Sequence, residues 1–199
     1  MFAFLAGIAA GLLHVVSGPD HLAAVAPLAS DRERGPWLTG LQWGFGHTAG
    51  VVLIASLLLL LKDQLPLDAI SAYSERVVGA TLIAIGMWGV WRAYQRHRQP
   101  HGEGHTHGGT SFAMGTVHGL AGSSHLFGVL PALAFPSRTA SVLYLAGFGL
   151  GAIAGMTAFS IAVGLLSSKL GRRSRGQRGL LYASSAAALV IGGVWLVGR

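Results

Sequence analysis

The sequence predicts an all-α polytopic membrane protein whose six transmembrane helices form a 3+3 inverted-topology repeat. Three observations predict this fold class: a composition poor in charge, long charge-free runs, and an internal repeat. Hydrophobic residues make up 52% of the 199 residues and charged residues only 11%, whereas soluble domains are about 25% charged. This composition excludes a soluble enzyme, a soluble nucleic-acid-binding domain and a disordered chain.

Long runs without Asp, Glu, Lys or Arg give the positions of the helices. These runs cover residues 1–19, 35–61, 77–91, 104–137, 139–168 and 179–198. Several of them reach the roughly 20 apolar residues with which a helix crosses a bilayer. We therefore expect transmembrane helices at 2–29, 36–61, 72–92, 111–135, 139–167 and 179–198. Six helices of about 22 residues would use about two thirds of the chain, so no extramembrane domain is expected.

Basic residues predict the orientation of these helices. The loops after the first, third and fifth spans hold ten of the 14 Lys and Arg residues: Arg32, Arg34, Arg92, Arg96, Arg98, Lys169, Arg172, Arg173, Arg175 and Arg178. The other side holds Lys62, Arg76, Arg138 and Arg199. Because cytoplasmic loops carry an excess of Lys and Arg, we expect a multi-pass protein of the cytoplasmic membrane with both termini outside. The net charge of +7 then belongs to membrane anchors, and no nucleic-acid partner is expected.

The second half of the chain repeats the first. GLLHVVSGPDHLAAVAPLA (11–29) matches GTVHGLAGSSHLFGVLPAL (115–133) at seven of nineteen positions. We divide the chain into a first three-helix repeat at 1–94, a His-rich cytoplasmic loop at 95–110 and a second three-helix repeat at 111–199. Since each repeat holds an odd number of spans, the second enters the membrane from the opposite side. Inverted repeats of this kind occur in transporters, whose substrate site lies near the midplane between the halves.

The first span carries an unusual set of ionisable residues. His14, Asp20 and His21 lie in an otherwise apolar stretch, although a charge at the centre of a membrane helix costs about 2.5–3.5 kcal/mol. In a straight helix the two histidines would be about 10.5 Å apart along the axis, too far to share a metal ion. Gly18 and Pro19 between them predict a helix break. We expect a metal site at this break, as in transporters with broken helices.

The second span offers a third imidazole. His47 lies in the segment GFGHT, between two glycines at positions 46 and 50. Small residues let membrane helices approach closely, and we expect Gly46 and Gly50 to pack against the first span. The predicted metal ligands are then His14, Asp20, His21 and His47.

The second repeat retains two histidines but no carboxylate between them. The residues aligned with Pro19 and Asp20 are both serines. This repeat is therefore predicted to supply either an accessory site or a gate, from His118, Ser124 and His125.

The ligand types predict the class of ion. The chain has no cysteine, and imidazole with carboxylate suits borderline divalent ions such as Ni²⁺, Co²⁺ or Zn²⁺, whereas Mg²⁺ or Ca²⁺ would need more oxygen ligands. The segment RHRQPHGEGHTHGGT (96–110) adds four histidines among Gly and Pro. We interpret it as a metal-gathering tract formed by His97, His101, His105 and His107.

At these residues the sequence resembles the nickel/cobalt permeases. HVVSGPDHLAAVAPL followed by LQWGFGHTAGVV is similar to that family's paired signature, H-x4-D-H in one transmembrane helix and G-H-[ST] in the next, although the first spacing here is H-x5-D-H. The likeness extends to the compact six-span UreH-type urease accessory nickel permeases, which carry an HGLAGS-like segment as at 118–123. The resemblance implies delivery of nickel to cytoplasmic maturation proteins of nickel enzymes. It also implies a nickel site made of His14, Asp20, His21 and His47.

These observations predict a secondary transporter, a permease for Ni²⁺ or Co²⁺ with no cofactor and no enzymatic activity. Its partners are the transported ion and the lipid bilayer. Import is expected from the likeness to the urease-associated permeases, and an efflux protein of the same superfamily is the alternative. An alternative of another class is a six-span intramembrane serine protease with Ser124 as nucleophile. Its base would be His14, His21 or His47.

Overall fold

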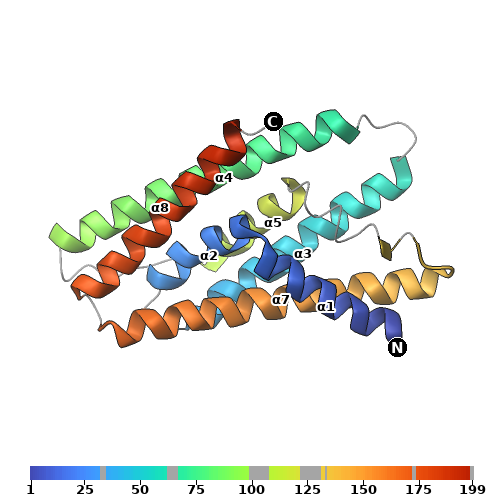
Figure 1. Cartoon of the computed structure of the whole chain (residues 1–199), viewed down its shortest axis with the longest axis horizontal. Coiled ribbons are helices and arrows are strands. Elements are labelled where there is room, and N and C mark those ends of the chain that lie inside the picture. Colours follow the sequence, from blue (N-terminus) through green and yellow to red (C-terminus); the bar gives the residue numbers. More distant parts are fainter. Residues whose placement is uncertain are drawn as a thin grey trace.

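A computed structural model describes residues 1–31, 35–61, 67–98, 108–121, 131–132, 134–171 and 174–197 (Figure 1). Seven helices lie in this part of the chain: α1 (Phe2–Ser17), α2 (Pro19–Asp31), α3 (Pro36–Leu61), α4 (Leu67–Arg98), α5 (Gly108–Ala121), α7 (Arg138–Lys169) and α8 (Arg175–Val197). No strand occurs among the described residues. The prediction of an all-α chain is confirmed for them.

One helix extends further than expected, and another is described over only part of its expected range. α4 continues to Arg98 rather than to 92, because the polar segment RAYQRHR contains mostly good helix formers and no Gly or Pro. α5 is described from Gly108 to Ala121, and most of the rest of the span expected at 111–135 lies outside the described residues. Residues 122–130 lie outside the described part.

Several helices are candidates for crossing a membrane. The segment Arg76–Gln95 of α4, α7 and α8 are each long and apolar enough, and the α1–α2 pair gives a fourth if it counts as one broken span. Large apolar side chains on these helices point outward, among them Leu13, Val142 and Val194. Such exposure suits contact with lipid and would be costly in water. The described residues therefore hold three or four candidate spans, and the full set of six remains a prediction.

The first span is broken at Gly18. α1 ends at Ser17, α2 begins at Pro19, and the two helices are bent by 74°. Proline suits the first position of a helix, where its missing N–H would have no intrahelical partner. A Cβ at position 18 would collide with Nδ1 of His21 and would lie 2.9 Å from Oδ1 of Asp20. Glycine is needed here because two side chains of the next helix fold back over it.

α1 packs against α7 at small residues. A Cβ at Gly11 would collide with the carbonyl oxygen of Phe148. One turn earlier in α1, Gly7 meets the backbone of Tyr144, one turn earlier in α7. The contacts advance together along both helices, so α1 and α7 run in the same direction.

α3 packs against α5 in the same manner. Gly46 approaches the backbone of Phe112, and Gly50 approaches that of Thr116, so these helices also run in the same direction. The expected packing of the two glycines against the first span is therefore wrong. A helix face made of small residues can pack against any other such face. In this structure the partner face is on α5, where Gly119 lies against the backbone of α3.

Two further helix pairs, α3–α7 and α4–α8, run in opposite directions. In the α3–α7 pair, Gly40 meets Met156, whereas Gly44, further along α3, meets Ile153. α4 and α8 form another such pair along one side of the molecule (Figure 1). The short helix α2 lies at the centre and contacts α3, α4, α7 and α8. The polar first turn of α2 is thereby enclosed by the other helices.

Candidate metal centre

The break in the first span brings His14 and His21 together. Their ring centroids are 4.6 Å apart, less than half of the roughly 10.5 Å axial rise between them in a straight helix. His14 lies in the last turn of α1, and His21 follows Asp20 in the first turn of α2. The Gly18 N–H donates to the His14 carbonyl at 3.1 Å, which closes α1 beside the ring.

Asp20 lies between two imidazoles. His21 Nδ1 donates to its Oδ1 and His118 Nε2 donates to its Oδ2, each at 3.1 Å. His118 comes from α5, 98 residues further along the chain. The Asp20 side chain is only 2% exposed, and its place in the first turn of α2 puts the carboxylate at the positive end of the helix dipole.

His47 adds a further imidazole from the middle of α3. Its ring centroid lies 4.9 Å from that of His21 and 5.7 Å from that of His14. We call His14, Asp20, His21, His47 and His118 the His/Asp cluster. The cluster contains two groups of three residues whose ligand atoms lie within 4.8 Å of one another. One group is His14, His21 and His47, and the other is Asp20, His21 and His118.

The His/Asp cluster is suited to hold a metal ion. Four of its members are buried and His14 is partly exposed. Metal–nitrogen bonds of about 2.0–2.1 Å place the ligand atoms of one ion no more than about 4.2 Å apart. Each group would therefore need only small side-chain adjustments to close on an ion.

Two aromatic side chains cover the cluster, and the sequence analysis did not identify them. Trp43 is buried with its ring 5.8 Å from that of His118, and the ring of Phe148 lies 5.4 Å from that of His14. Trp43 precedes His47 by four residues, which places the two on one face of α3. That spacing is the signal in the sequence for Trp43, and no comparable signal exists for Phe148.

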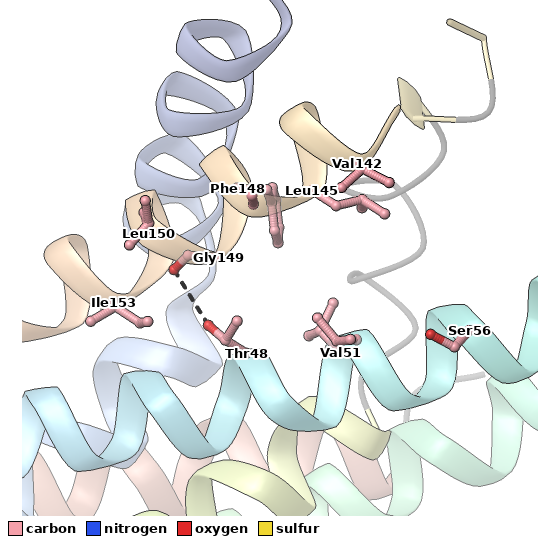
Figure 2. Close-up of a pocket in the computed structure, with 11 residues that line it drawn as sticks. Thr48, Val51, Ser56, Val142, Leu145, Phe148, Gly149, Leu150 and Ile153 are labelled. Carbon is pink, nitrogen blue, oxygen red and sulfur yellow. Dashed lines mark hydrogen bonds between the residues drawn. The ribbon is translucent and has the colours of Figure 1, made fainter. Parts of the chain in front are cut away.

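An apolar pocket of about 390 Å³ lies between α3 and α7 (Figure 2). Most of its lining side chains are Val, Leu and Ile, and Thr48 Oγ1 donates to the Gly149 carbonyl at 3.4 Å across it. Phe148 lines this pocket and also contacts the ring of His14. None of the lining residues is charged, so the pocket suits an apolar group rather than a metal ion.

The other predicted site residues cannot be related to the cluster. Ser124 and His125 fall within residues 122–130, outside the described part. The loop histidines at 101, 105 and 107 are outside it as well, and His97 is described only by its place on the α4 backbone. The roles of His97, His101, His105, His107, Ser124 and His125 stay predictions.

A partly buried ion pair holds the other end of α2. Arg92 Nε in α4 donates to Asp31 Oδ2 at 3.1 Å, and the Asp31 side chain is only 1% exposed. Beside this pair, Ser167 Oγ donates to the Ser30 carbonyl at 3.2 Å, and Gln177 Nε2 donates to Ser167 Oγ at 3.0 Å. The helix that carries two residues of the cluster is therefore fixed to α4 and α7 at its last turn.

We expect Arg92→Ala to destabilise the protein by on the order of 3 kcal/mol, because it removes the Arg92 guanidinium from its ion pair with the buried Asp31 carboxylate. Thermal unfolding of the purified protein in detergent measures this, with the exposed Arg138→Ala as the matched control. Adding Asp31→Asn to Arg92→Ala should recover part of the loss. Equal unfolding midpoints for the Arg92 and Arg138 variants would contradict the expectation.

The fold and the cluster define an all-helical protein with candidate membrane spans and a buried His/Asp group able to hold a metal ion. No family model and no solved structure matches the chain. It is 39% identical over 200 residues to Chloroplast protein FOR GROWTH AND FERTILITY 2 and 36% identical over 206 residues to Chloroplast protein FOR GROWTH AND FERTILITY 1, both of Arabidopsis thaliana. Each alignment covers 94% of this chain but only 54% and 56% of the relatives, so the chain spans about half their length.

A more distant similarity extends over most of both proteins. The chain is 25% identical over 201 residues to Urease accessory protein UreH of Bacillus sp. (strain TB-90), covering 94% of this chain and 86% of that protein. The similarity is low, but it agrees with the resemblance drawn from the His-Asp-His segment and G-H-T.

Proposed function

We propose that the chain is a permease that moves Ni²⁺, and also Co²⁺, across a membrane as a secondary transporter. The observation that carries this proposal is the His/Asp cluster, buried at the break between α1 and α2 in an apolar helical protein. Transporters build ion sites at such broken helices, because irregular backbone at membrane depth is tolerated only where protein or a cavity surrounds it. The similarity to a urease accessory protein is the second support.

The ligand set supports a borderline transition metal. Four imidazoles and one carboxylate surround the site, a combination that favours Ni²⁺, Co²⁺ or Zn²⁺ over Mg²⁺ and Ca²⁺. One carboxylate offsets part of the charge of a divalent ion, so binding and release can both remain feasible. The ion is the substrate. Its proposed recipients on the cytoplasmic side, where the basic loops are predicted to lie, are proteins that mature nickel enzymes.

The directions of the helices support the 3+3 inverted repeat. α1 runs with α7, α7 runs against α3, and α3 runs with α5. The first helices of the two repeats, α1 and α5, therefore run in opposite directions, as an inverted repeat requires. The contacts between the two repeats are reciprocal, because the first helix of each repeat packs on the second helix of the other.

The position of His47 supports a site near the middle of the membrane. It lies 11 residues after Pro36 and 14 residues before Leu61, the ends of α3. At about 1.5 Å per residue, these separations are roughly 17 Å and 21 Å. An ion at His47 would therefore lie near the centre of a hydrocarbon core about 30 Å thick.

The cluster also bears on the protease alternative. His14, His21 and His47, the three candidate bases, are gathered around one another, and His21 donates to Asp20. This arrangement favours metal binding, because a protease needs one base beside its serine rather than three imidazoles together. Labelling by a serine-reactive probe, with loss of the label in Ser124→Ala, would support the protease instead.

Uptake of labelled Ni²⁺ into vesicles that hold the purified protein in one orientation tests the proposal. We expect saturable uptake that Co²⁺ reduces. Empty vesicles are the control. Uptake of external Ni²⁺ only into vesicles of the opposite orientation would support the efflux alternative instead. Absence of Ni²⁺ and Co²⁺ flux in both orientations would overturn the proposal.

Deleting residues 97–107 should weaken uptake at low Ni²⁺ and leave the rate at saturating Ni²⁺ nearly intact. The reason is that a His-rich tract raises the local ion concentration without forming the membrane site. Concentration-dependent uptake measures this, with replacement of the same segment by a Gly/Ser linker of equal length as the control. Loss of transport at saturating Ni²⁺ would place the segment in the pathway itself.

Single cysteines test the proposed topology, because the chain has none of its own. Arg34→Cys and Arg173→Cys should react with an impermeant maleimide only from the cytoplasmic side, and Asp68→Cys only from outside. Labelling of intact and opened spheroplasts, with functional uptake of each variant as the control, measures this. Labelling of positions 68 and 173 from the same side would contradict the inverted repeat.

A further inference from the structure

We infer that the cluster holds the ion in two successive positions that share His21, an inference that rests on the proposed transport function. The first position is formed by His14, His21 and His47. The second is formed by Asp20, His21 and His118. The ion passes from the first position to the second by exchanging its partners around the His21 ring.

The grouping of the ligands carries this inference. Only His21 belongs to both groups whose ligand atoms lie within 4.8 Å of one another. Its ring lies 4.6 Å from His14 and 4.9 Å from His47, and 4.8 Å from His118. The ring of His47 lies 5.7 Å from that of His14 and 5.9 Å from that of His118, so both are farther from it than His21 is. His21 is therefore at the centre, with two sets of partners around it.

The two nitrogens of His21 give each position its own ligand atom. Nδ1 donates to Asp20 Oδ1 at 3.1 Å, and Nε2 points in a different direction from the same ring. With an ion on Nε2, Asp20 orients the ring through Nδ1, the carboxylate–histidine–metal arrangement common in proteins. With an ion in the second position, the His21 proton moves from Nδ1 to Nε2, which the ion has left, and Nδ1 binds the metal in place of its hydrogen bond to Asp20. His118 likewise binds through Nε2 with its proton on Nδ1.

Burial gives the two positions an order. His14 of the first position is partly exposed, whereas Asp20, His21 and His118 of the second are all buried. The first position is therefore the one that an arriving ion meets, and the second encloses it. The carboxylate in the second position compensates the charge of an ion there, where desolvation is more complete.

The second position also couples the ion to the shape of the protein. All three ligands of the first position belong to the first repeat, on α1, α2 and α3. The second position joins Asp20 and His21 to His118 of α5, in the second repeat. A ligand shifts a conformational equilibrium only if it binds the two states differently. An ion in the second position does so, because its binding depends on how the two repeats are placed.

Co²⁺ binding to the purified full chain tests the inference, with His47→Gln and His118→Gln as a matched pair. Glutamine keeps an amide N–H that can donate to Asp20 but offers no imidazole nitrogen. We expect the parent to bind one Co²⁺, because adjacent positions that share a ligand are not filled together. Each variant should still bind one Co²⁺ and yet lose Ni²⁺ transport. X-ray absorption should find mainly imidazole nitrogens in His118→Gln and fewer imidazoles plus carboxylate oxygen in His47→Gln.

The other outcomes separate this inference from the proposed function. His21→Ala and the double variant His47→Gln/His118→Gln should both lose Co²⁺ binding. Identical absorption spectra for the two single variants, or loss of binding in both, would mean one site and would overturn the two positions while leaving a metal permease in place. A parent protein that binds neither Co²⁺ nor Ni²⁺ would overturn the proposed function itself. If either glutamine variant fails to elute as a single species, His47→Asn and His118→Asn replace the pair.

Discussion

Asp20→Asn is expected to yield a folded membrane protein whose initial rate of Ni²⁺ uptake is about 10- to 100-fold lower. The asparagine keeps the size of the side chain but removes the negative charge that faces a cation in a low-dielectric site. It also removes one of the two acceptor oxygens that receive hydrogen bonds from His21 and His118. A neutral amide is cheaper to place in a membrane than a carboxylate, so the variant should insert at least as well as the parent.

Expression, elution profile and uptake are to be measured together for Asp20→Asn. Asp68→Asn, which changes a carboxylate outside the predicted site, is the control for charge loss as such. Normal uptake by Asp20→Asn would show that the carboxylate is not needed for transport. Failure of the variant to accumulate in the membrane would make Asp20 structural, a residue whose purpose is to join α2 to His118 of α5.

The members of the His/Asp cluster on neighbouring helices could be predicted because their signals are local. Gly18 and Pro19 indicate a break in an apolar stretch, and the structure bends by 74° between α1 and α2. A bend between His14 and His21 brings the two residues closer than they would be in a straight helix, and the sequence alone indicates this bend. The all-helical fold could also be predicted from the sequence, because charge-free runs of this length leave few other structures for the chain.

The place of His118 could not be predicted in the same way. Its partner Asp20 lies 98 residues away, and the two meet only because α5 packs on α3 beside α2. The second repeat has no carboxylate of its own, which suggested an accessory site or a gate. In the structure the histidine of the second repeat completes a group with the carboxylate of the first.

The helix partners were also beyond the reach of local signals. A pair of glycines one turn apart shows that a helix face can approach another closely, but it does not say which helix. Gly46 and Gly50 pack against α5 rather than against the first span. The choice depends on a matching small-residue face elsewhere, and such faces occur on α1, α5 and α7 of this chain.

Gly119→Ala is the second change expected to have a large effect, because it acts on this packing and on the site together. A Cβ at Gly119 would collide with the carbonyl oxygen of His47, and a backbone atom cannot turn aside as a flexible side chain can. α5 must then move away from α3, which separates His118 from the rest of the cluster. Overpacking of this kind costs typically about 1–3 kcal/mol. We therefore expect a lower thermal unfolding midpoint and loss of Ni²⁺ uptake.

Gly109→Ala is the matched control, since it lies on the same helix and a Cβ there meets nothing within 4 Å. Alanine is a better helix former than glycine by about 0.5–1 kcal/mol, so the control should be as stable as the parent or slightly more stable. The difference between the two variants then measures the close contact alone, free of helix propensity. If Gly119→Ala has the same unfolding midpoint and the same Ni²⁺ uptake as Gly109→Ala, then α3 and α5 do not approach each other closely at this residue. The joining of His118 to the first repeat would then lose its structural basis, and with it the second ion position.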